Sequence, residues 1–363
     1  MPSLVKPELI PWPQPKQTEL PLDWAPLDII DMSKWDTPGG KEALARDLAS
    51  AVRNMGFWVV TNTGIPQEMI DRQWALANTF FKLPEEEKRE VTFVAGESCF
   101  GYRPPGLVRN STAKENLEMV NLHKFTPGAN FPRHKFLAQF EDEITAFQKL
   151  VFEKVITKLF ILIAIVLELP ENHFVDMHQF DKQSDDHVRF IKYSVRSIEE
   201  DKAVGDQWMA GHTDFGSITL LFPQPIAALQ VRTPENEWKW VRYVEGGITC
   251  NAADLMSFMT KGYVKSAIHR VVRPPADQAH LERLGIFFFV RASNDVVIKP
   301  SPSPVLKREG LWTKEDDETA DDNAATCGEF VVARMQNFNL SRTAQTKDNS
   351  VVRVKNWEVS NIY

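Results

Sequence analysis

Residues 211–221, with the sequence GHTDFGSITLL, decide how the rest of the chain is interpreted. His212 and Asp214 are separated by a single residue, so on an extended segment their side chains project to the same side. An imidazole and a carboxylate placed in this way can bind one metal ion. The short apolar run that follows, Ser217–Phe222, is typical of a buried strand. The stretch therefore predicts a metal site at the end of a strand in a sheet.

A third candidate ligand lies further along the chain. His269 stands 57 residues after His212, within the sequence KSAIHRV of residues 265–271, on a strand that we expect to run beside the first. Two neutral imidazoles and one carboxylate on one face of an octahedral ion form the arrangement used for non-haem Fe(II). The absence of thiolate ligands and the single carboxylate favour Fe(II) over zinc. This arrangement leaves open positions for oxygen and a co-substrate.

Arg283 begins an otherwise apolar stretch, ERLGIFFF, at residues 282–289. An arginine whose neighbours are buried needs an anionic partner, and its planar guanidinium suits a carboxylate. The alternative is an arginine at a strand end with its charged head in solvent. The sequence thus offers a candidate anion-binding group near the candidate metal site.

The pattern around these motifs predicts strands after residue 188 and helices before it. Helical spacing is expected over residues 44–55, ending at Gly56, from Pro66 to Phe81, and over a long buried helix from Glu143 to Glu168. A short strand is expected at residues 57–60. Further short runs predict strands at Ser217–Phe222, Leu229–Arg232, Lys239–Tyr243, Asp254–Thr260, Ile268–Val272 and Leu284–Arg291. Several short strands in succession indicate a β-sandwich or jelly roll.

Composition excludes several classes of protein. The 363 residues suggest roughly two domains or one large domain with additions, and the 43% apolar and 25% charged residues are typical of a packed globular protein. The net charge of −7 has the wrong sign for a nucleic-acid-binding protein. Much of that charge comes from the acidic stretch at residues 315–322, for which we expect a solvated loop.

Cysteine content and hydropathy indicate the compartment. The three cysteines, Cys99, Cys250 and Cys327, form no CxxC pair, which argues against a disulfide framework or a thiolate zinc site. We find no signal peptide, and the longest apolar run, Leu159–Leu167, is too short to span a membrane. We therefore predict a cytoplasmic protein with no membrane or nucleic-acid partner.

Taken together and in order, these motifs resemble those of the iron- and 2-oxoglutarate-dependent dioxygenase superfamily, in the group that includes isopenicillin N synthase and fungal small-molecule oxygenases. The resemblance rests on the segments GFWVVTNTGIP at residues 56–66, FFKLPEEEK at 80–88, GY at 101–102, HTD at 212–214, SAIHRV at 266–271, and on Arg283. It implies a mainly β fold with α elements. The core would be a distorted double-stranded β-helix, or jelly roll, flanked by N-terminal and long central helices.

The resemblance also implies cofactors and roles for individual residues. Fe(II), 2-oxoglutarate and O2 would be the cofactors, and His212, Asp214 and His269 would bind the iron. Arg283 matches the arginine that binds the distal carboxylate of 2-oxoglutarate. Tyr193 matches a tyrosine that often hydrogen-bonds the same region of the co-substrate. No catalytic residue is expected beyond this metal centre.

The expected organisation has four parts along the chain. Residues 1–26, which hold seven of the 23 prolines, would form an extended arm, and residues 27–180 the N-terminal helical region of the dioxygenase fold. Residues 181–300 would form the jelly-roll dioxygenase core. Residues 301–363 would be a C-terminal extension that covers the core.

Three departures from the family pattern keep an alternative open. The family's arginine is followed two residues later by a serine, whose position here is taken by Gly285, with the loss of one hydrogen bond worth about 0.5–1.5 kcal/mol. The interval from His269 to Arg283 is longer than in plant members, and the segment IKY at residues 191–193 looks more like isopenicillin N synthase. An iron oxidase that uses O2 without 2-oxoglutarate is therefore the alternative. A non-catalytic binding module is disfavoured by the intact ligand set, and a zinc hydrolase by the absence of HExxH.

For the substrate pocket we expect Phe289 and Phe222 from the core strands and Tyr102 and Arg103 from the N-terminal region. Buried aromatic residues are more often simple packing residues, which is the alternative for each phenylalanine. An apolar, aromatic pocket favours a hydrophobic natural product. The predicted activity is oxidation of an unactivated C–H bond of a small molecule, by hydroxylation, desaturation or ring rearrangement, in secondary metabolite biosynthesis.

Overall fold

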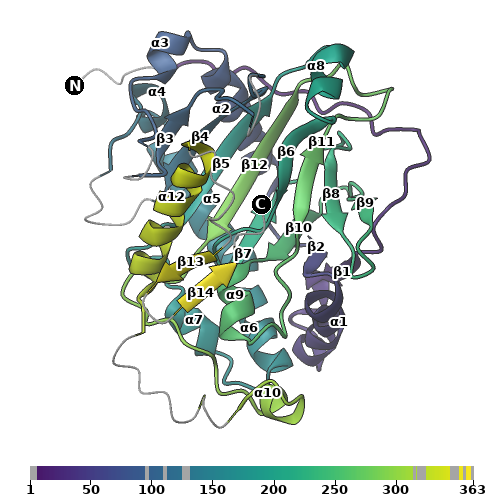
Figure 1. The fold of residues 1–363 in the computed structure, drawn as a ribbon, viewed down its shortest axis with the longest axis vertical. Coiled ribbons are helices and arrows are strands. Elements are labelled where there is room, and N and C mark those ends of the chain that lie inside the picture. The colour runs from purple at the N-terminus through teal and green to yellow at the C-terminus, as the bar shows by residue number, and fades with distance from the viewer. Residues whose placement is uncertain are drawn as a thin grey trace.

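The core is built from two facing β-sheets, a large sheet with helices on its outer face and a smaller sheet opposite (Figure 1). The computed structural model describes residues 6–94, 98–108, 113–124, 131–313, 316, 324–343, 351–354 and 357–360. Within these residues the strands are β1 Asp28–Asp31, β2 Phe57–Thr61, β3 Gly101–Arg103, β4 Leu117–His123, β5 His187–Tyr193, β6 Gln207–His212, β7 Ile218–Leu221, β8 Leu229–Arg232, β9 Trp238–Trp240, β10 Ile248–Ala252, β11 His269–Val272, β12 Arg283–Val290, β13 Val351–Val354 and β14 Trp357–Ser360.

Strand order shows the jelly roll. The large sheet runs β1-β2-β10-β7-β12-β5-β4-β3 and the small sheet β6-β11-β8-β9, while β13 and β14 form a separate hairpin. All pairs are antiparallel except β1 with β2. Figure 1 shows β5, β12 and β7 crossing the middle of the molecule, with β6 and β11 of the small sheet beside them. The predicted fold class, a mainly β jelly roll with helices, is confirmed.

Helices supply the apolar cover of the large sheet. They are α1 Gly40–Asn54, α2 Gln67–Phe81, α3 Glu85–Lys88, α4 Lys135–Ala138, α5 Glu141–Val151, α6 Thr157–Val166, α7 His173–Met177, α8 Ile198–Ala203, α9 Asp254–Met259, α10 Pro304–Arg308 and α12 Cys327–Thr343, with a 3-10 turn at Met32–Lys34 and a π-helical turn at Phe152–Ile156. The predicted long helix at 143–168 is thus a helical run from 141 to 166 that contains one π turn. The predicted helices ending at Gly56 and starting at Pro66 are confirmed as α1 and α2.

Successive side chains along the strands of the large sheet point to opposite faces of the sheet. On β12, Leu284, Ile286 and Phe288 pack against the helices in the main hydrophobic core, whereas Phe287 packs among residues between the sheets. The same parity holds across neighbouring strands because the register pairs residues directly opposite one another. One set of strand residues therefore serves the helical core, and the other set faces the space between the sheets.

One predicted strand is wrong. Residues 254–260, expected to be extended, form helix α9 followed by a turn. Leu255, Met256 and Met259 are buried at helical spacing, and Asp254 lies in the first turn, where a carboxylate is favourable. Strand β10 was missed, because Thr249 and Asn251 interrupt the apolar pattern of a strand that is buried on both faces.

The turn at Gly56 has a strict requirement for glycine. Its φ of +64° is left-handed, and a Cβ there would lie 2.2 Å from the carbonyl oxygen of Lys265. The Lys265 N–H donates in turn to Val52 O at 2.8 Å. This close approach attaches the end of α1 to the segment that leads into His269.

The N-terminal segment and the residues after 300 both contact the rest of the fold. In residues 6–26, which contain no helix, the Ile10 N–H donates to Thr79 Oγ1 at 2.7 Å, and Thr18 Oγ1 donates to Asp277 at 2.9 Å. At the other end, Leu306 and Phe330 are buried in the main core. The expected acidic loop at 315–322 lies outside the described residues except for Asp316, and the four-part division of the chain stays a prediction. No helix among the described residues is long and apolar enough to cross a membrane.

Candidate metal centre and active site

Three predicted ligands meet between the sheets. His212 ends β6, Asp214 follows it in the loop toward β7, and His269 begins β11, where it pairs directly with His212. Nε2 of each histidine lies 3.9 Å from Asp214 Oδ1, and the three ligand atoms lie within 4.8 Å of one another. The prediction that these side chains converge is confirmed, and that they bind iron stays a prediction.

Backbone carbonyls set the protonation of both imidazoles. His212 Nδ1 lies 2.9 Å from Ala210 O, and His269 Nδ1 lies 3.1 Å from Ala267 O. A carbonyl only accepts, so each Nδ1 carries the proton and each Nε2 presents its lone pair to Asp214 and the space beside it. Burial, assisted by His269, lowers the pKa of His212 to about 4, so this ring is neutral at pH 7.

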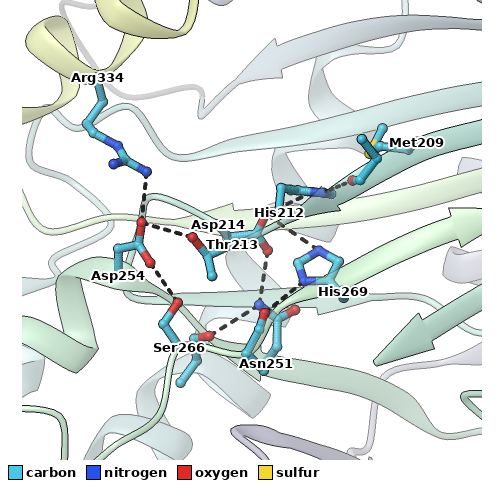
Figure 2. Close-up of polar contacts among 12 residues, drawn as sticks. Met209, His212, Thr213, Asp214, Asn251, Asp254, Ser266, His269 and Arg334 are labelled. Atoms are coloured by element: carbon cyan, nitrogen blue, oxygen red, sulfur yellow. Dashed lines mark hydrogen bonds and ion pairs between the residues drawn. The ribbon is translucent and has the colours of Figure 1, made fainter. Parts of the chain in front are cut away.

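Asp214 is held as a carboxylate by its neighbours. Asn251 of β10 donates to Asp214 Oδ2 at 3.0 Å (Figure 2). Burial alone would raise the pKa of Asp214, but His269, His212 and hydrogen bonds from Asn251 and Thr219 bring it below its ordinary value. A carboxylate that remains charged beside two lone-pair nitrogens is suited to a divalent cation.

A second carboxylate, that of Asp254, is hydrogen-bonded to both segments that carry the candidate ligands. Its side chain accepts from Thr213 Oγ1 at 3.2 Å, from Ser266 Oγ at 2.7 Å and from Arg334 at 2.8 Å (Figure 2). Its N–H also donates to Asp214 O at 2.9 Å. Burial raises the pKa of Asp254, and Arg334 opposes this. Asp254 thus connects the loop that carries Asp214, the segment before His269 and helix α12.

The triad opens on a cavity of about 550 Å³, a volume that includes its solvent-open mouth. Its apolar wall comes from both sheets and includes Phe57, Leu221, Leu229, Val271, Phe287 and Phe289. His269 packs edge-on against Phe57 at 5.4 Å between ring centroids. The space beside the triad is therefore mostly apolar.

Arg283 and Tyr193 also line this cavity, directly paired on β12 and β5. The Arg283 side chain is 2% exposed, and its Nε and Nη1 have no hydrogen-bond partner among the described residues. Its guanidinium carbon lies 5.4 Å from the centre of the Tyr193 ring. Burial lowers the pKa of Arg283 and raises that of Tyr193 to about 12. An unpaired buried guanidinium calls for an anionic ligand.

Of the four residues expected to line the pocket, Phe289 does so. Arg103 lies on the same sheet face, since its partner Met119 is opposite Ile191, but it is ion-paired to Glu115 and lies outside this cavity.

Tyr102 and Phe222 face the helices instead, so the structure does not place them in the pocket. The Tyr102 hydroxyl donates to Glu118 at 2.8 Å, and Phe222 packs against Phe147 at 5.1 Å between ring centroids. Both belong to the main hydrophobic core. Strand alternation explains the correction, because a shift of one residue moves a side chain to the opposite face.

Sequence reasoning missed Arg189, Asn251, Asp254 and Arg334. Arg189 on β5 carries the same signal as Arg283, a cation within an apolar strand, HVRFI at residues 187–191. The link from Asp254 to Arg334 had no such signal, since the two residues are 80 positions apart.

The donor set fits iron(II). Two imidazole nitrogens and one carboxylate form a facial set that leaves other positions open, as non-haem Fe(II) requires. The unpaired Arg283 lies on the wall of the same cavity, where it can hold the far carboxylate of 2-oxoglutarate. His212, Asp214 and His269 would hold the metal.

Comparison with known families covers most of the chain. Residues 27–141 match the N-terminal model of the non-haem dioxygenase in morphine synthesis, and residues 184–292 match the 2OG-Fe(II) oxygenase superfamily. A UPF0676 protein of Schizosaccharomyces pombe is 30% identical over 88% of this chain and 95% of its own length.

Other relatives carry named activities. The coumaroyl CoA and feruloyl CoA ortho-hydroxylase of Ipomoea batatas is 27% identical over 78% of this chain and 75% of its own length. The proline hydroxylase buaE of Petromyces alliaceus is 27% identical over 75% of this chain and 88% of its own.

Among solved structures, a full-length Neurospora crassa protein crystallised with alpha-KG and thymine superposes with a TM-score of 0.73. It is 25% identical, and the match covers 85% of this chain and 96% of that one. The overall fold of this chain thus has a counterpart among solved structures.

Proposed function

Because this chain belongs to the 2OG-Fe(II) oxygenase superfamily, whose members are oxidoreductases that use Fe(II), 2-oxoglutarate and O2, we propose that it oxidises an unactivated C–H bond of a hydrophobic small molecule in secondary metabolism. The observation that carries the proposal is the convergence of His212, Asp214 and His269 beside a cavity walled by aromatic and aliphatic side chains. An apolar cavity of this kind favours an apolar substrate.

The unpaired Arg283 supports the use of 2-oxoglutarate over the oxidase alternative. Leaving two guanidinium nitrogens buried without partners is unfavourable unless a ligand satisfies them. A carboxylate does so with the fork geometry that arginine prefers. In an oxidase that needs no co-substrate, the same cation would have to pair with an anionic group of the organic substrate.

The relatives are consistent with a small-molecule substrate but differ among themselves. Their names include an ortho-hydroxylase of coumaroyl and feruloyl CoA, a proline hydroxylase and an azadirone synthase. The substrates in these names differ, since function depends on the site and not on the fold.

In this mechanism the protein binds, orients and excludes water. His212 and His269, fixed by carbonyls at Nδ1, would present Nε2 to the ion, and Asn251 would keep Asp214 aimed at it. Arg283 would hold the distal carboxylate of the co-substrate. Phe287 and Phe289 would pack against the substrate and keep water from the reacting carbon. Iron(II), when bound, supplies O2 activation coupled to conversion of 2-oxoglutarate to succinate and CO2.

The test is succinate formation by the Fe(II) protein with 2-oxoglutarate, with and without aromatic and terpenoid compounds. We expect succinate in the wild type and none in His269→Ala. In Arg283→Ala the KM for 2-oxoglutarate should rise about 10- to 100-fold, because a charge-assisted pair is lost. Its KM for the organic substrate should change little.

Two outcomes would contradict the proposal. Oxygen consumption with substrate but without succinate would support the isopenicillin N synthase-like oxidase. Turnover of small charged amino acids, with no aromatic or terpenoid compound accepted, would exclude the hydrophobic substrate class.

A further inference from the structure

The cavity is lined by a second arginine besides Arg283. Arg189 of β5 lines the cavity together with the triad. Its Nε donates to Asn121 Oδ1 at 2.7 Å, and its guanidinium carbon lies 4.4 Å from the centre of the Phe289 ring. These two contacts fix the plane of the guanidinium without neutralising it. Burial lowers the pKa of Arg189 to about 10, which still leaves it charged at pH 7.

No carboxylate of the described residues lies within ion-pair distance of Arg189. Two other cations differ in this respect: Lys192, three residues further along β5, pairs with Glu282 at 2.9 Å, and Lys88 of α3 pairs with Glu118 of β4 at 2.6 Å. A half-buried cation that lines an apolar cavity without a charged partner is a candidate for binding an anionic ligand.

The position of Arg189 separates it from the co-substrate arginine. Arg189 pairs across the sheet with Phe287, four residues along β12 from Arg283, which is about 13 Å of strand. Arg189 lines the same cavity as His212, Asp214 and His269. One arginine is thus placed for the far end of 2-oxoglutarate, and the other for a ligand beside the metal.

Charge balance indicates what that ligand carries. Apart from the two histidines, the charged side chains that line the cavity are Arg189, Asp214 and Arg283. With a divalent iron and a dianionic co-substrate in place, the cavity has one positive charge left over. A single carboxylate balances it, whereas a phosphate would leave an excess of negative charge.

We propose that Arg189 binds a carboxylate of the organic substrate, whose apolar part packs against Phe289 and Phe287. The two rings stack at 5.9 Å between centroids with an interplanar angle of 18°, which offers a flat apolar surface beside the cation. This inference rests on the proposed function and narrows the substrate class to an amphipathic monocarboxylate.

The test measures binding and does not depend on turnover. The Mn(II) protein with saturating 2-oxoglutarate is titrated by calorimetry with phenylacetate and cinnamate, with their amides, and with thymine as a planar neutral probe. We expect the wild type to bind each carboxylate at least tenfold more tightly than its amide. Arg189→Gln should lose about 10- to 100-fold in carboxylate affinity. Its affinities for the amides and for 2-oxoglutarate should stay within twofold.

Three variants make the result specific. Lys192→Gln removes a cation from the same strand but from its opposite face, and should leave the carboxylate preference unchanged. Arg283→Gln should weaken 2-oxoglutarate and spare the probes. Arg189→Lys keeps the charge without the fork and should give an intermediate loss, which also provides a second variant should the glutamine variant not fold.

The inference is overturned if carboxylates and amides bind the wild type equally, if thymine binds more tightly than the carboxylates, or if Arg189→Gln weakens 2-oxoglutarate instead of the probes. Failure of the proposed function is recognised separately, because then 2-oxoglutarate itself would not bind the wild-type metalloprotein.

Discussion

At the residue scale, Gly285 shows how the cavity wall is packed. It lies between Arg283 and Phe287 on the cavity face of β12, at the position where the family pattern has serine. A Cβ built there would lie 2.9 Å from Phe287 Cε2 and 3.0 Å from Ile191 Cγ2. The Phe287 ring thus occupies space that a serine side chain at position 285 would need.

We predict that Gly285→Ser lowers the free energy of unfolding by about 1–3 kcal/mol, because the Phe287 ring must move to make room. Combining it with Phe287→Leu should restore stability and lower the KM for 2-oxoglutarate several-fold, since the hydroxyl then gains space beside the co-substrate. Chemical denaturation and the succinate assay measure the two effects. A fully stable single variant would show that the ring does not restrict this position.

At the element scale, α12 is attached to the metal centre through a buried ion pair. Arg334 is 1% exposed, and its guanidinium lies 4.4 Å from the Phe215 ring and 2.8 Å from Asp254. Asp254, at the start of α9, in turn holds Thr213 and Ser266 on either side of the triad. Removing one member of a buried pair leaves the other charge without compensation, at a cost of about 3–5 kcal/mol.

We therefore predict that Arg334→Ala destabilises the fold by about that amount and weakens Mn(II) binding by up to about tenfold, the low end for groups bonded directly to a metal ligand. The matched control is Arg308→Ala, which removes an ion pair to Glu168 between exposed side chains and should change stability by less than about 1 kcal/mol. If Arg334→Ala lowers stability but leaves metal affinity intact, α12 supports the fold alone.

At the scale of the whole molecule, the triad joins segments of both sheets. His212 and His269 belong to β6 and β11 of the small sheet, and Asp214 accepts a hydrogen bond from Asn251 of the large sheet. A metal bound by all three would link the two sheets, and it binds only the folded state with this geometry.

Divalent metal should therefore stabilise the whole fold. At a hundredfold excess over Kd the gain is about 2.7 kcal/mol, which for a chain of this length is a rise in Tm of about 3 °C. We expect Mn(II) to produce this rise in the wild type and in His280→Ala, where the altered histidine is exposed, but not in His269→Ala. An equal rise in His269→Ala would refute its assignment as a ligand.

The metal triad could be predicted because its information is local. A spacing of two residues puts His212 and Asp214 on one side, and the segment before His269 has its own recognisable sequence. Arg283 was predicted from its apolar neighbours. Arg189 carries the same signal and was missed, since the pattern alone does not say which buried cations share a cavity.

Where prediction failed, the missing information was register or distant contact. Tyr102 and Phe222 are aromatic residues close in sequence to segments expected at the site, but both side chains pack in the main core with the helices. The segment at 254–259 has apolar positions compatible with either a strand or a helix, and the buried contacts of α9 decide for the helix.

The sequence by itself predicted the jelly-roll class, the three candidate ligands and Arg283 as the candidate co-substrate arginine, because each is marked by residue type and short spacing within its own chain segment. Only the tertiary structure decided which side chains face the cavity, that Arg189 stands there unpaired, and that Asp254 and Arg334 support the ligand loops. Those facts depend on sheet register and on contacts between residues far apart in sequence, and neither is encoded in local pattern.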